Sequence, residues 1–451
     1  MNILENLKNY FDSDVTKDVE FRIQQLKNLK TVFKKFEPQI FKALKDDLKK
    51  PDLEIYLMEF GPVIEEIDYA ISNLKKWAKP EKVSIPFYLK PNEGFIYKEP
   101  FGTVLIINAF NYPFQLAFCP LIGAIAAGNC AVVKTSRLNK ESSKVIKAII
   151  EETFSENYVT CLNDVEGSSL TNLKFDYIFF TGNPKTGSLI AQEAAKNLVP
   201  YTLELGGKSP CIVEKSANLK AAARKIAWGK FVNAGQTCIA PDYVLVQKEI
   251  KEEFLEEIKT AIKEFFGPVT QESKDFGRII DTNSFLRLKN LIDYDKLIYG
   301  GSTDECGLYI EPAIVRADSF EEPVMQEEIF GPILPVMEFE TTDKIIEILK
   351  KREKPLALYV FSQDEKITQN IINSLSFGGG AVNETLAHAV SLEMPFGGVG
   401  MSGIGRYHGK FSFDTFTHQK SILINRQKNP SLKMLPPYDF EEIKKLRNFI
   451  G

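Results

Sequence analysis

From Gly102 onward, short apolar runs rich in β-branched residues alternate with helical patterns, and this alternation restricts the possible folds more than any other feature. Such runs occur at VLII (104–107), AVV (131–133), YIFF (177–180) and TLEL (202–205). Helical patterns such as ESSKVIKAIIEETF lie between them. Strands that are apolar on both faces and separated by helices predict a parallel sheet with right-handed crossovers. A second series, with CIV (211–213), YVLV (243–246), LALYVF (356–361) and AVN (381–383), predicts a second α/β region.

The two ends of the chain follow other patterns. Residues 1–80 repeat apolar residues at three- and four-residue spacing, as in FRIQQLKNLKTVFKKFEPQIF, and this predicts helices. The segments 83–99 and 417–427 alternate as extended chain does and carry apolar residues without obvious core partners, namely Ile85, Phe87, Ile422 and Leu423. Unpaired strand edges of this kind normally find a partner, so we expect these segments to join two copies of the chain.

Composition excludes several classes of protein. The 451 residues are 44% hydrophobic and 26% charged, which predicts a folded chain with more than one core. A net charge of −4 gives no basis for binding nucleic acid, and the longest apolar stretch is too short and interrupted to span a membrane. Six cysteines without a CxxC pair and only three histidines argue against a metal site or a disulfide framework. We therefore expect a cytoplasmic protein without a metal.

The most informative cysteine is Cys238, in the segment FVNAGQTCIA (231–240). It follows Gly235, Gln236 and Thr237 after a helical stretch, which places it on a turn instead of a hydrophobic face. A thiol in an exposed turn can have a lowered pKa and act as a nucleophile at neutral pH. A buried structural thiol is the ordinary alternative, and it suits Cys119, Cys130 and Cys161, which lie in apolar runs.

Glu204 lies between two leucines in LELGGKSP (203–210), at the predicted end of a strand. Removal of water from a carboxyl raises its pKa, and a carboxylate tuned in this way can act as a general base on water. A glutamate that turns into solvent at the strand end is an equal alternative for this motif alone.

Three further segments follow strands or precede turns. FTGNPKTGS (180–188) has the strand, glycine turn and helix start that can bind a pyrophosphate, although any such turn can use two glycines. In NAFNYP (108–113), the Asn111 amide can donate to an oxyanion, or it can hold its own turn. In QEEIFGP (326–332), Glu328 can bind ribose hydroxyls, or it can be a solvated acid.

Taken together and in this order, the five segments resemble the aldehyde dehydrogenase superfamily over essentially the whole chain. AWGKFVNAGQTCIAPDY, PVMQEEIFGPILP and MPFGGVGMSGIGRYHGKFSFDTFTH are similar to its class 3 branch. The resemblance implies NAD- or NADP-dependent oxidation of medium-chain aliphatic or aromatic aldehydes to carboxylic acids by a homodimer. It also implies an α/β fold with two doubly wound α/β domains and a β-ribbon oligomerisation arm.

The resemblance divides the chain into three parts. It implies a cofactor-binding domain from residues 1–82 and 100–206, a catalytic domain from 207–416, and an oligomerisation ribbon with a tail from 83–99 and 417–451. It implies Cys238 as the nucleophile, Glu204 as the base and Asn111 in the oxyanion hole. The cofactor would be held by Lys134, the turn from Gly182 to Gly187, Glu328 and Phe330. Tyr56 and Tyr112 would line the substrate entrance. Asn383 and His388 would lie in another segment that approaches the aldehyde tunnel, and we expect no catalytic role for them.

Two positions depart from the family pattern. Phe110 stands where the family usually has tryptophan, which keeps an aromatic wall without the indole N–H. Arg137 stands where the family usually has a glutamate that binds the ribose 2′-hydroxyl, so the sign of the interaction with a 2′-phosphate is reversed. Arg137 therefore predicts acceptance of NADP, unless its side chain points away from the cofactor.

Three alternative functions remain open at this point. A cysteine hydrolase would need a histidine beside Cys238, and all three histidines lie in the last seventh of the chain. A CoA-acylating dehydrogenase would not need the base Glu204. A catalytically silent binding protein on this fold would not need to retain Cys238, Glu204 and Asn111 together.

Overall fold

The computed structural model describes residues 3–86, 89–165, 170, 172, 174–426, 436–437, 440–441, 443–444 and 447. The chain divides into two compact units. The first contains Met1–Trp77 and Pro100–Thr417, and the second contains Ala78–Glu99 and His418–Gly451. Among the described residues, no helix has both the length and the apolar character needed to cross a membrane.

A six-stranded sheet in the first unit has the order β17-β7-β6-β3-β4-β5. Its parallel strands are β3 (Thr103–Ile107), β4 (Cys130–Lys134), β5 (Val159–Leu162), β6 (Tyr177–Thr181) and β7 (Tyr201–Glu204). The short strand β17 (Gly403–Ile404) pairs antiparallel with β7. The chain runs outward from β3 to β5 and then returns to add β6 and β7 on the other side. This doubly wound order places a topological switch point between β3 and β6, where ligands bind in open α/β sheets.

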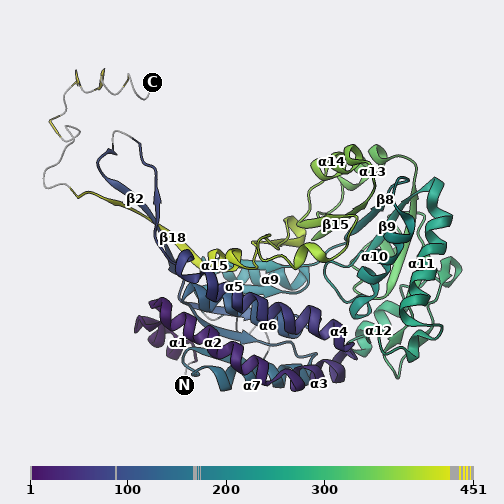
Figure 1. Cartoon of the computed structure of the whole chain (residues 1–451), viewed down its shortest axis with the longest axis horizontal. Helices are drawn as coiled ribbons and strands as arrows, with labels where there is room; N and C mark the ends of the chain where they lie inside the picture. Colours follow the sequence, from purple (N-terminus) through teal and green to yellow (C-terminus); the bar gives the residue numbers. More distant parts are fainter. Residues whose placement is uncertain are drawn as a thin grey trace. The chain divides into compact units, whose positions relative to one another are not determined.

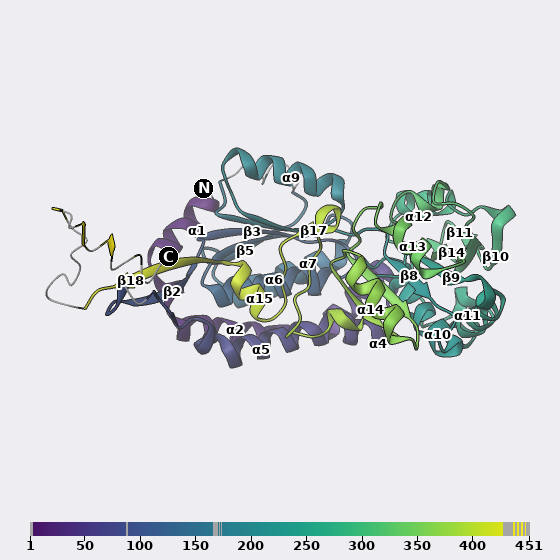
Figure 2. The same cartoon turned by 90° about the horizontal axis from the view of Figure 1, so that it is seen from above.

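Helices cover both faces of this sheet. Figure 2 shows α9 (Pro184–Lys196) on one side and α6 (Pro113–Ala127) with α7 (Lys140–Thr153) on the other. The amino-terminal helices α2 (Val19–Lys35) and α5 (Gly61–Trp77) lie beyond α6 and α7. The apolar stripe of α2 buries Ile23, Leu26, Leu29 and Phe33, as its helical spacing predicts. The remaining elements of this region are α1 (Ile3–Asp12), α3 (Glu37–Leu48), α4 (Asp52–Ile55), a π turn at Tyr56–Phe60 and α15 (Lys410–Thr415).

A seven-stranded sheet, β10-β13-β14-β9-β8-β15-β16, forms the other half of the first unit (Figure 1). Its strands are β8 (Pro210–Val213), β9 (Tyr243–Gln247), β10 (Leu297–Tyr299), β13 (Ala313–Arg316), β14 (Ile333–Phe339), β15 (Ala357–Phe361) and β16 (Gly379–Val382). All pairs are parallel except β10 with β13. The helices around it are α10 (Leu219–Phe231), α11 (Lys251–Phe266), α12 (Thr282–Lys289), α13 (Thr342–Leu349) and α14 (Glu365–Ser374). A small hairpin joins β11 (Thr303–Asp304) to β12 (Tyr309–Ile310).

Each sheet has its own hydrophobic cluster. The first cluster extends from Leu4 to Leu205 and the second from Cys211 to Leu386. Tyr407, Phe413 and Phe416 belong to the first cluster, although the family resemblance implies a catalytic domain that continues to residue 416. The cause is β17, whose pairing with β7 returns the chain to the first sheet. The boundary between the cofactor-binding and catalytic domains therefore remains a prediction.

The second unit contains a three-stranded sheet in the order β1-β2-β18. Its strands are β1 (Glu81–Val83), β2 (Glu93–Pro100) and β18 (Thr417–Ile424). Lys420 pairs with Glu99 at 2.8 Å and Arg426 with Glu93 at 2.8 Å, so ion pairs link the two extended segments. Ile422 and Leu423 on β18 are exposed. Phe87 lies outside the described residues.

Candidate active site

A cavity of about 1510 Å³ opens where the carboxyl ends of the first sheet face the second cluster. Its walls contain residues that follow β3, β6 and β7, together with residues from the turn before β9 and the loop before β14. The predicted site residues in its lining are Asn111, Lys134, Gly182, Glu204, Cys238, Glu328 and Phe330. The fold therefore gathers seven predicted residues that are spread over more than two hundred positions of sequence.

Cys238 lies on a tight turn after α10. Three consecutive residues of this turn, Asn233, Ala234 and Gly235, have left-handed φ angles of 52°, 51° and 76°. A Cβ at Gly235 would lie 2.3 Å from the carbonyl oxygen of Gly331, so only glycine allows this approach. The turn that carries the cysteine is thereby packed directly against the loop that carries Glu328 and Phe330.

The expectation of an exposed thiol with a lowered pKa is wrong for this state of the protein. Cys238 is half-buried, and burial raises the pKa of its thiol to about 12. The nearby carboxyls of Glu328 and Glu204 raise it further, whereas the backbone N–H groups of Cys238 and Ile239 lower it. The thiol is therefore protonated at neutral pH until a positive charge or a base approaches it.

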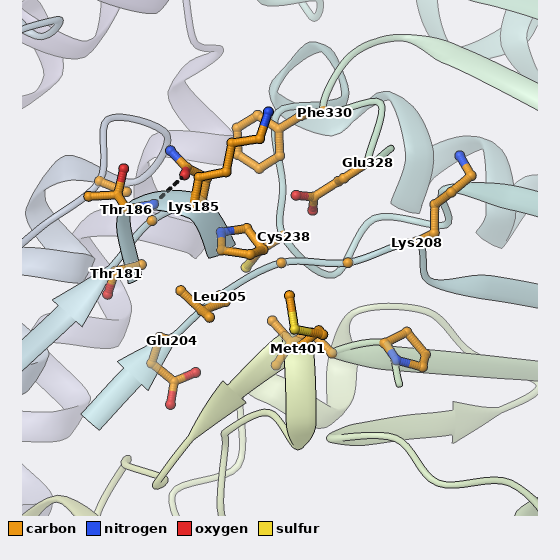
Figure 3. A pocket seen from close by; sticks show the side chains of 18 of the residues that line it. Thr181, Lys185, Thr186, Glu204, Leu205, Lys208, Cys238, Glu328, Phe330 and Met401 are labelled. Atoms are coloured by element: carbon orange, nitrogen blue, oxygen red, sulfur yellow. Dashed lines mark hydrogen bonds between the residues drawn. The ribbon is translucent and has the colours of Figure 1, made fainter. Parts of the chain in front are cut away.

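Glu204 ends β7 and is 3% exposed. Burial raises the pKa of its carboxyl well above the ordinary value, as the LELGG context predicts. Neither carboxyl oxygen has a hydrogen-bond partner among the described residues. In Figure 3 the carboxyl is directed away from Cys238. Burial therefore favours the neutral form of Glu204, and its carboxyl must turn before it can act on a group bound to the sulfur.

Asn111 lies on the loop between β3 and α6, at the switch point of the first sheet. Its backbone carbonyl accepts a hydrogen bond from Lys50 Nζ at 2.7 Å and another from Asn233 Nδ2 at 3.0 Å. The next residue, Tyr112, has its hydroxyl 2.6 Å from Thr237 Oγ1, beside Cys238. The loop and the cysteine turn are therefore held together at two points.

Glu328 and Phe330 form the opposite wall of the cavity (Figure 3). Burial and the neighbouring Asp242 raise the pKa of Glu328 to about 8, and its carboxyl accepts a hydrogen bond from the Gly207 backbone. A Cβ at Gly206 would lie 2.2 Å from this carboxyl, so the absence of a side chain at Gly206 makes room for it. The rings of Phe330 and Phe110 meet edge to face at 5.6 Å, and Phe110 keeps the expected aromatic wall.

The residues of the cleft fit a dinucleotide. Gly182, Lys185 and Thr186 line the cavity at the amino-terminal end of α9, where the helix dipole favours a phosphate. Lys134 also lines it, and burial together with the nearby Arg137 charge lowers the pKa of its ammonium group. At one end of the cleft, the cations Lys134 and Lys185 lie near the start of α9, which suits a pyrophosphate. At the other end, the Glu328 carboxyl lies near the Phe330 ring, which suits a nicotinamide ribose.

Four predicted residues lie outside the lining. Arg137 is exposed between Ser136 and Leu138, which both line the cavity. Gly187 faces Leu205, since a Cβ there would lie 2.8 Å from Leu205 Cδ2, and it serves close packing of α9. Tyr56, the third of these residues, is 50% exposed. Tyr112, the fourth, is buried, and its hydroxyl lies 3.7 Å from the Met58 sulfur.

Asn383 and His388, for which no catalytic role is expected, make structural contacts. The Asn383 amide exchanges hydrogen bonds with the backbone of Ser362 at 3.0 and 2.8 Å. The His388 ring packs against Tyr359 and Phe396, and burial lowers its pKa to about 4.

Sequence reasoning missed the charged groups that support the site. Lys208 donates to Asp242 at 2.6 Å and to the carbonyl of Val324 at 2.7 Å. Asp242 also accepts from the backbone N–H of Ile329 at 3.0 Å, so one ion pair fixes the loop that presents Glu328. Lysine in GGKSP and aspartate in APDY do lie beside the motifs, but neither spacing shows that they meet.

The cleft lies at the switch point of an α/β sheet, its walls fit a dinucleotide, and a cysteine on a turn faces it. These features define a class of α/β enzymes that carry a cysteine in a nucleotide-binding cleft. The pattern of the aldehyde dehydrogenase family matches residues 6–422. The 4,4'-diaponeurosporen-aldehyde dehydrogenase of Staphylococcus aureus is 48% identical over 446 residues, with 97% of each chain covered. The dimeric NADP-preferring aldehyde dehydrogenase of Mus musculus is 41% identical over 430 residues, with 95% of each chain covered.

A solved structure, the substrate-bound state of Staphylococcus aureus AldH, superposes with a TM-score of 0.98 at 46% identity, and each chain is covered completely. Aldehyde dehydrogenase family 3 member A2 of Rattus norvegicus is 40% identical over 438 residues, covering 96% of this chain and 90% of the relative. The chain belongs to the aldehyde dehydrogenase family, in a class 3-like branch, and has the α/β fold of that family.

Proposed function

We propose that the protein oxidises medium-chain aliphatic or aromatic aldehydes to carboxylic acids with NAD or NADP. The observation that carries this proposal is that Cys238, Asn111 and Glu204 line one cavity with Glu328 and Phe330. Membership of a family that oxidises aldehydes supports it. A hydrolase is disfavoured because none of His388, His408 and His418 is among the described residues that line the cavity with Cys238.

In the first half of the reaction, the Cys238 thiol gives up its proton to solvent, and the resulting thiolate adds to the aldehyde carbon. The carbonyl oxygen becomes an oxyanion, which the Asn111 amide and the Cys238 backbone N–H stabilise by hydrogen bonds. Glu328 and Phe330 would hold a nicotinamide cofactor, which would supply the hydride acceptor for this adduct. The acyl group then remains on Cys238 as a thioester.

In the second half, Glu204 removes a proton from water, and the resulting hydroxide attacks the thioester carbon. The carbon–sulfur bond breaks, which releases the carboxylic acid and returns Cys238. The Glu204 carboxyl must first turn towards Cys238 and lose its proton. Its present carboxyl has no hydrogen-bond partner among the described residues to hold it, so few interactions oppose that turn.

For the cofactor, we propose that Arg137 permits NADP to bind at least as well as NAD. Arg137 lies between two residues of the cavity lining, three positions from Lys134. A guanidinium can bind a 2′-phosphate through two hydrogen bonds, and hydrogen bonds to charged groups contribute about 1.5–3 kcal/mol before screening by salt. The mouse relative is named as NADP-preferring.

We propose an aldehyde with an apolar chain, because exposed leucines lie on either side of Tyr56, the residue predicted at the substrate entrance. Leu53 and Leu57 are 68% and 54% exposed on the segment whose Met58 contacts Tyr112. A relative that is 48% identical takes its name from 4,4'-diaponeurosporen-aldehyde. A long polyene aldehyde is therefore a second candidate substrate beside the medium-chain and aromatic ones. We also propose that the protein is a homodimer joined through the second unit and that it is located in the cytoplasm.

One experiment tests the core of this function. Reduction of cofactor is followed spectroscopically with hexanal, benzaldehyde and retinal, each with NAD and NADP in parallel. We expect oxidation with both cofactors in the wild type and none in Cys238→Ser, which should still bind cofactor. Substantial activity in the serine variant would refute the assignment of the nucleophile. Arg137→Glu should shift the ratio of kcat/KM towards NAD, and an unchanged ratio would remove Arg137 from the cofactor site.

A further inference from the structure

The segment Lys50–Phe60 places a buried ion pair beside the loop that carries Asn111. Lys50 Nζ lies 2.6 Å from Glu59 Oε1, and the two side chains are 1% and 0% exposed. Burial lowers the pKa of Lys50 and raises the pKa of Glu59, so each charge depends on the other to remain ionised. A charge pair buried this completely, and unused in the proposed reaction, requires an explanation.

The partners of the pair point to the oxyanion loop. The remaining hydrogen bond of Lys50 goes to the backbone carbonyl of Asn111 at 2.7 Å, and its ammonium lies 4.0 Å from the centre of the Tyr112 ring. Glu59 Oε2 accepts from the backbone N–H groups of Phe114 and Gln115 at 3.0 and 3.2 Å. The pair therefore contacts Asn111 itself and the chain that follows it, at the start of α6.

The local backbone makes this contact possible. Tyr56–Phe60 forms a single turn of π-helix, which is wider than an α-helical turn and is frequent at functional sites. A Cβ at Gly61 would lie 2.8 Å from the Tyr56 carbonyl oxygen, so glycine permits the turn to close. Glu54, before the turn, accepts from the backbone N–H of Asn233 at 3.0 Å. The same short segment thus reaches both the Asn111 loop and the turn that carries Cys238.

We infer that Lys50 and Glu59 are positioning residues for the oxyanion hole: they fix the backbone of Asn111 so that its amide faces the oxygen that develops charge. The inference rests on the proposed function of Asn111. Misplacement of a reacting or stabilising group by about 1 Å can cost on the order of 100-fold in rate, so a small shift of the loop is enough.

The test is a double-mutant cycle between Lys50→Met and Asn111→Ala, measured on the full-length protein by pre-steady-state reduction of cofactor. Asn111→Ala alone should lower the rate about 100- to 1000-fold, the usual effect of one lost oxyanion donor. Lys50→Met should lower it about 10-fold or more when Asn111 is present. It should lower it less than about 3-fold in the Asn111→Ala background, because no amide is left to misplace.

Two readouts separate positioning from a merely structural role. KM for the cofactor and the rate of Cys238 alkylation should be unchanged in Lys50→Met, because neither depends on the Asn111 amide. The matched control is Lys45→Met, which breaks the exposed pair with Asp52 (2.5 Å) on the adjoining helix and should leave all rates unchanged. If Lys50→Met fails to fold with Glu59 left unpaired, Lys50→Met/Glu59→Gln removes both charges and is judged by the same cycle.

The outcomes distinguish this inference from the proposed function. Equal losses for Lys50→Met in both backgrounds, or a loss of Cys238 reactivity, would overturn the positioning role. An Asn111→Ala variant with the wild-type rate would instead refute the oxyanion role of Asn111, on which the proposed function depends.

Discussion

At the scale of single residues, the resting site holds its main chemical groups in their neutral forms. The pKa of Cys238 is raised to about 12 by burial, and the pKa of Glu204 is raised well above its ordinary value. A protonated thiol is a poor nucleophile, and a carboxyl whose burial favours the protonated form is a poor base. Activation must therefore come from a change in the electrostatics of the cavity when it fills.

The raised thiol pKa predicts the pH dependence of alkylation. Only the thiolate reacts, and its fraction rises about tenfold per pH unit below the pKa. The rate of iodoacetamide reaction at Cys238 should therefore still be rising between about pH 8 and pH 10, below the raised pKa. NAD, whose ring carries a positive charge, should accelerate it at neutral pH. Peptide mass spectrometry in a Cys306→Ser background avoids the exposed Cys306. A plateau near the ordinary thiol pKa of about 8.5 without cofactor would contradict the burial effect.

Glu204 predicts a division between the two halves of the reaction. Glu204→Gln should lower steady-state turnover roughly 100- to 10,000-fold, the range for a lost general base. The burst of reduced cofactor should survive, because hydride leaves before water is activated. Stopped-flow absorbance measures both phases, and Glu249→Gln, an exposed carboxylate, serves as the control. Loss of the burst with Cys238 still reactive would reassign Glu204 to activation of the thiol.

At the scale of elements, the turn at Val232–Gly235 joins the two halves of the site. Its left-handed residues follow α10, and Gly235 packs against the backbone of Gly331. Gly267 has a similar φ of 78°, but a Cβ placed there would have no described atom within 4 Å, so it forms a natural comparison.

Gly235→Ala should therefore be much more damaging than Gly267→Ala. Both substitutions strain a backbone with positive φ, at a cost on the order of 1–3 kcal/mol, and Gly267, with ψ of −179°, lies in a region that almost only glycine adopts. Only Gly235→Ala also forces two backbone segments apart. We expect a lower unfolding temperature and a large loss of activity for Gly235→Ala, and a lower unfolding temperature with normal activity for Gly267→Ala. Equal effects in thermal unfolding and in cofactor reduction would show that the contact with Gly331 is unimportant.

The elements also show how far the sequence can be interpreted. The buried strands VLII, YIFF and YVLV were predictable because apolar runs between helices have few other solutions. The cavity residues followed from short motifs at strand ends. Lys50 and Glu59 were not predictable, because a lysine beside Pro51 and a glutamate in a helical segment are ordinary surface patterns. The return of Tyr407 and Phe416 to the first cluster depends on a two-residue strand that no periodicity reveals.

At the scale of the whole molecule, the second unit predicts a dimer. In its sheet, β18 is an edge strand, and its residues Ile422 and Leu423 are 36% and 50% exposed. Exposed apolar edges normally pair. We expect sedimentation of the wild type as a dimer at micromolar concentration, and of Ile422→Lys/Leu423→Lys as a monomer. Val269→Lys, at an apolar residue that is 52% exposed elsewhere in the chain, should remain dimeric. A wild-type monomer would refute this role of the ribbon.

The cavity between the two hydrophobic clusters affects how well the protein tolerates amino-acid substitutions. A ligand that fills it contacts both clusters and binds only the folded chain, so its binding free energy adds to the free energy of unfolding. A ligand at about one hundred times its Kd contributes about 2.7 kcal/mol, more than many single substitutions remove. When the cofactor is abundant, its binding would offset the stability lost through a substitution in either core. When the cofactor is scarce, the same substitution would lower the fraction of folded protein. The inherited sequence variation that the fold can carry is then set by the metabolic state of the cell as well as by its own packing.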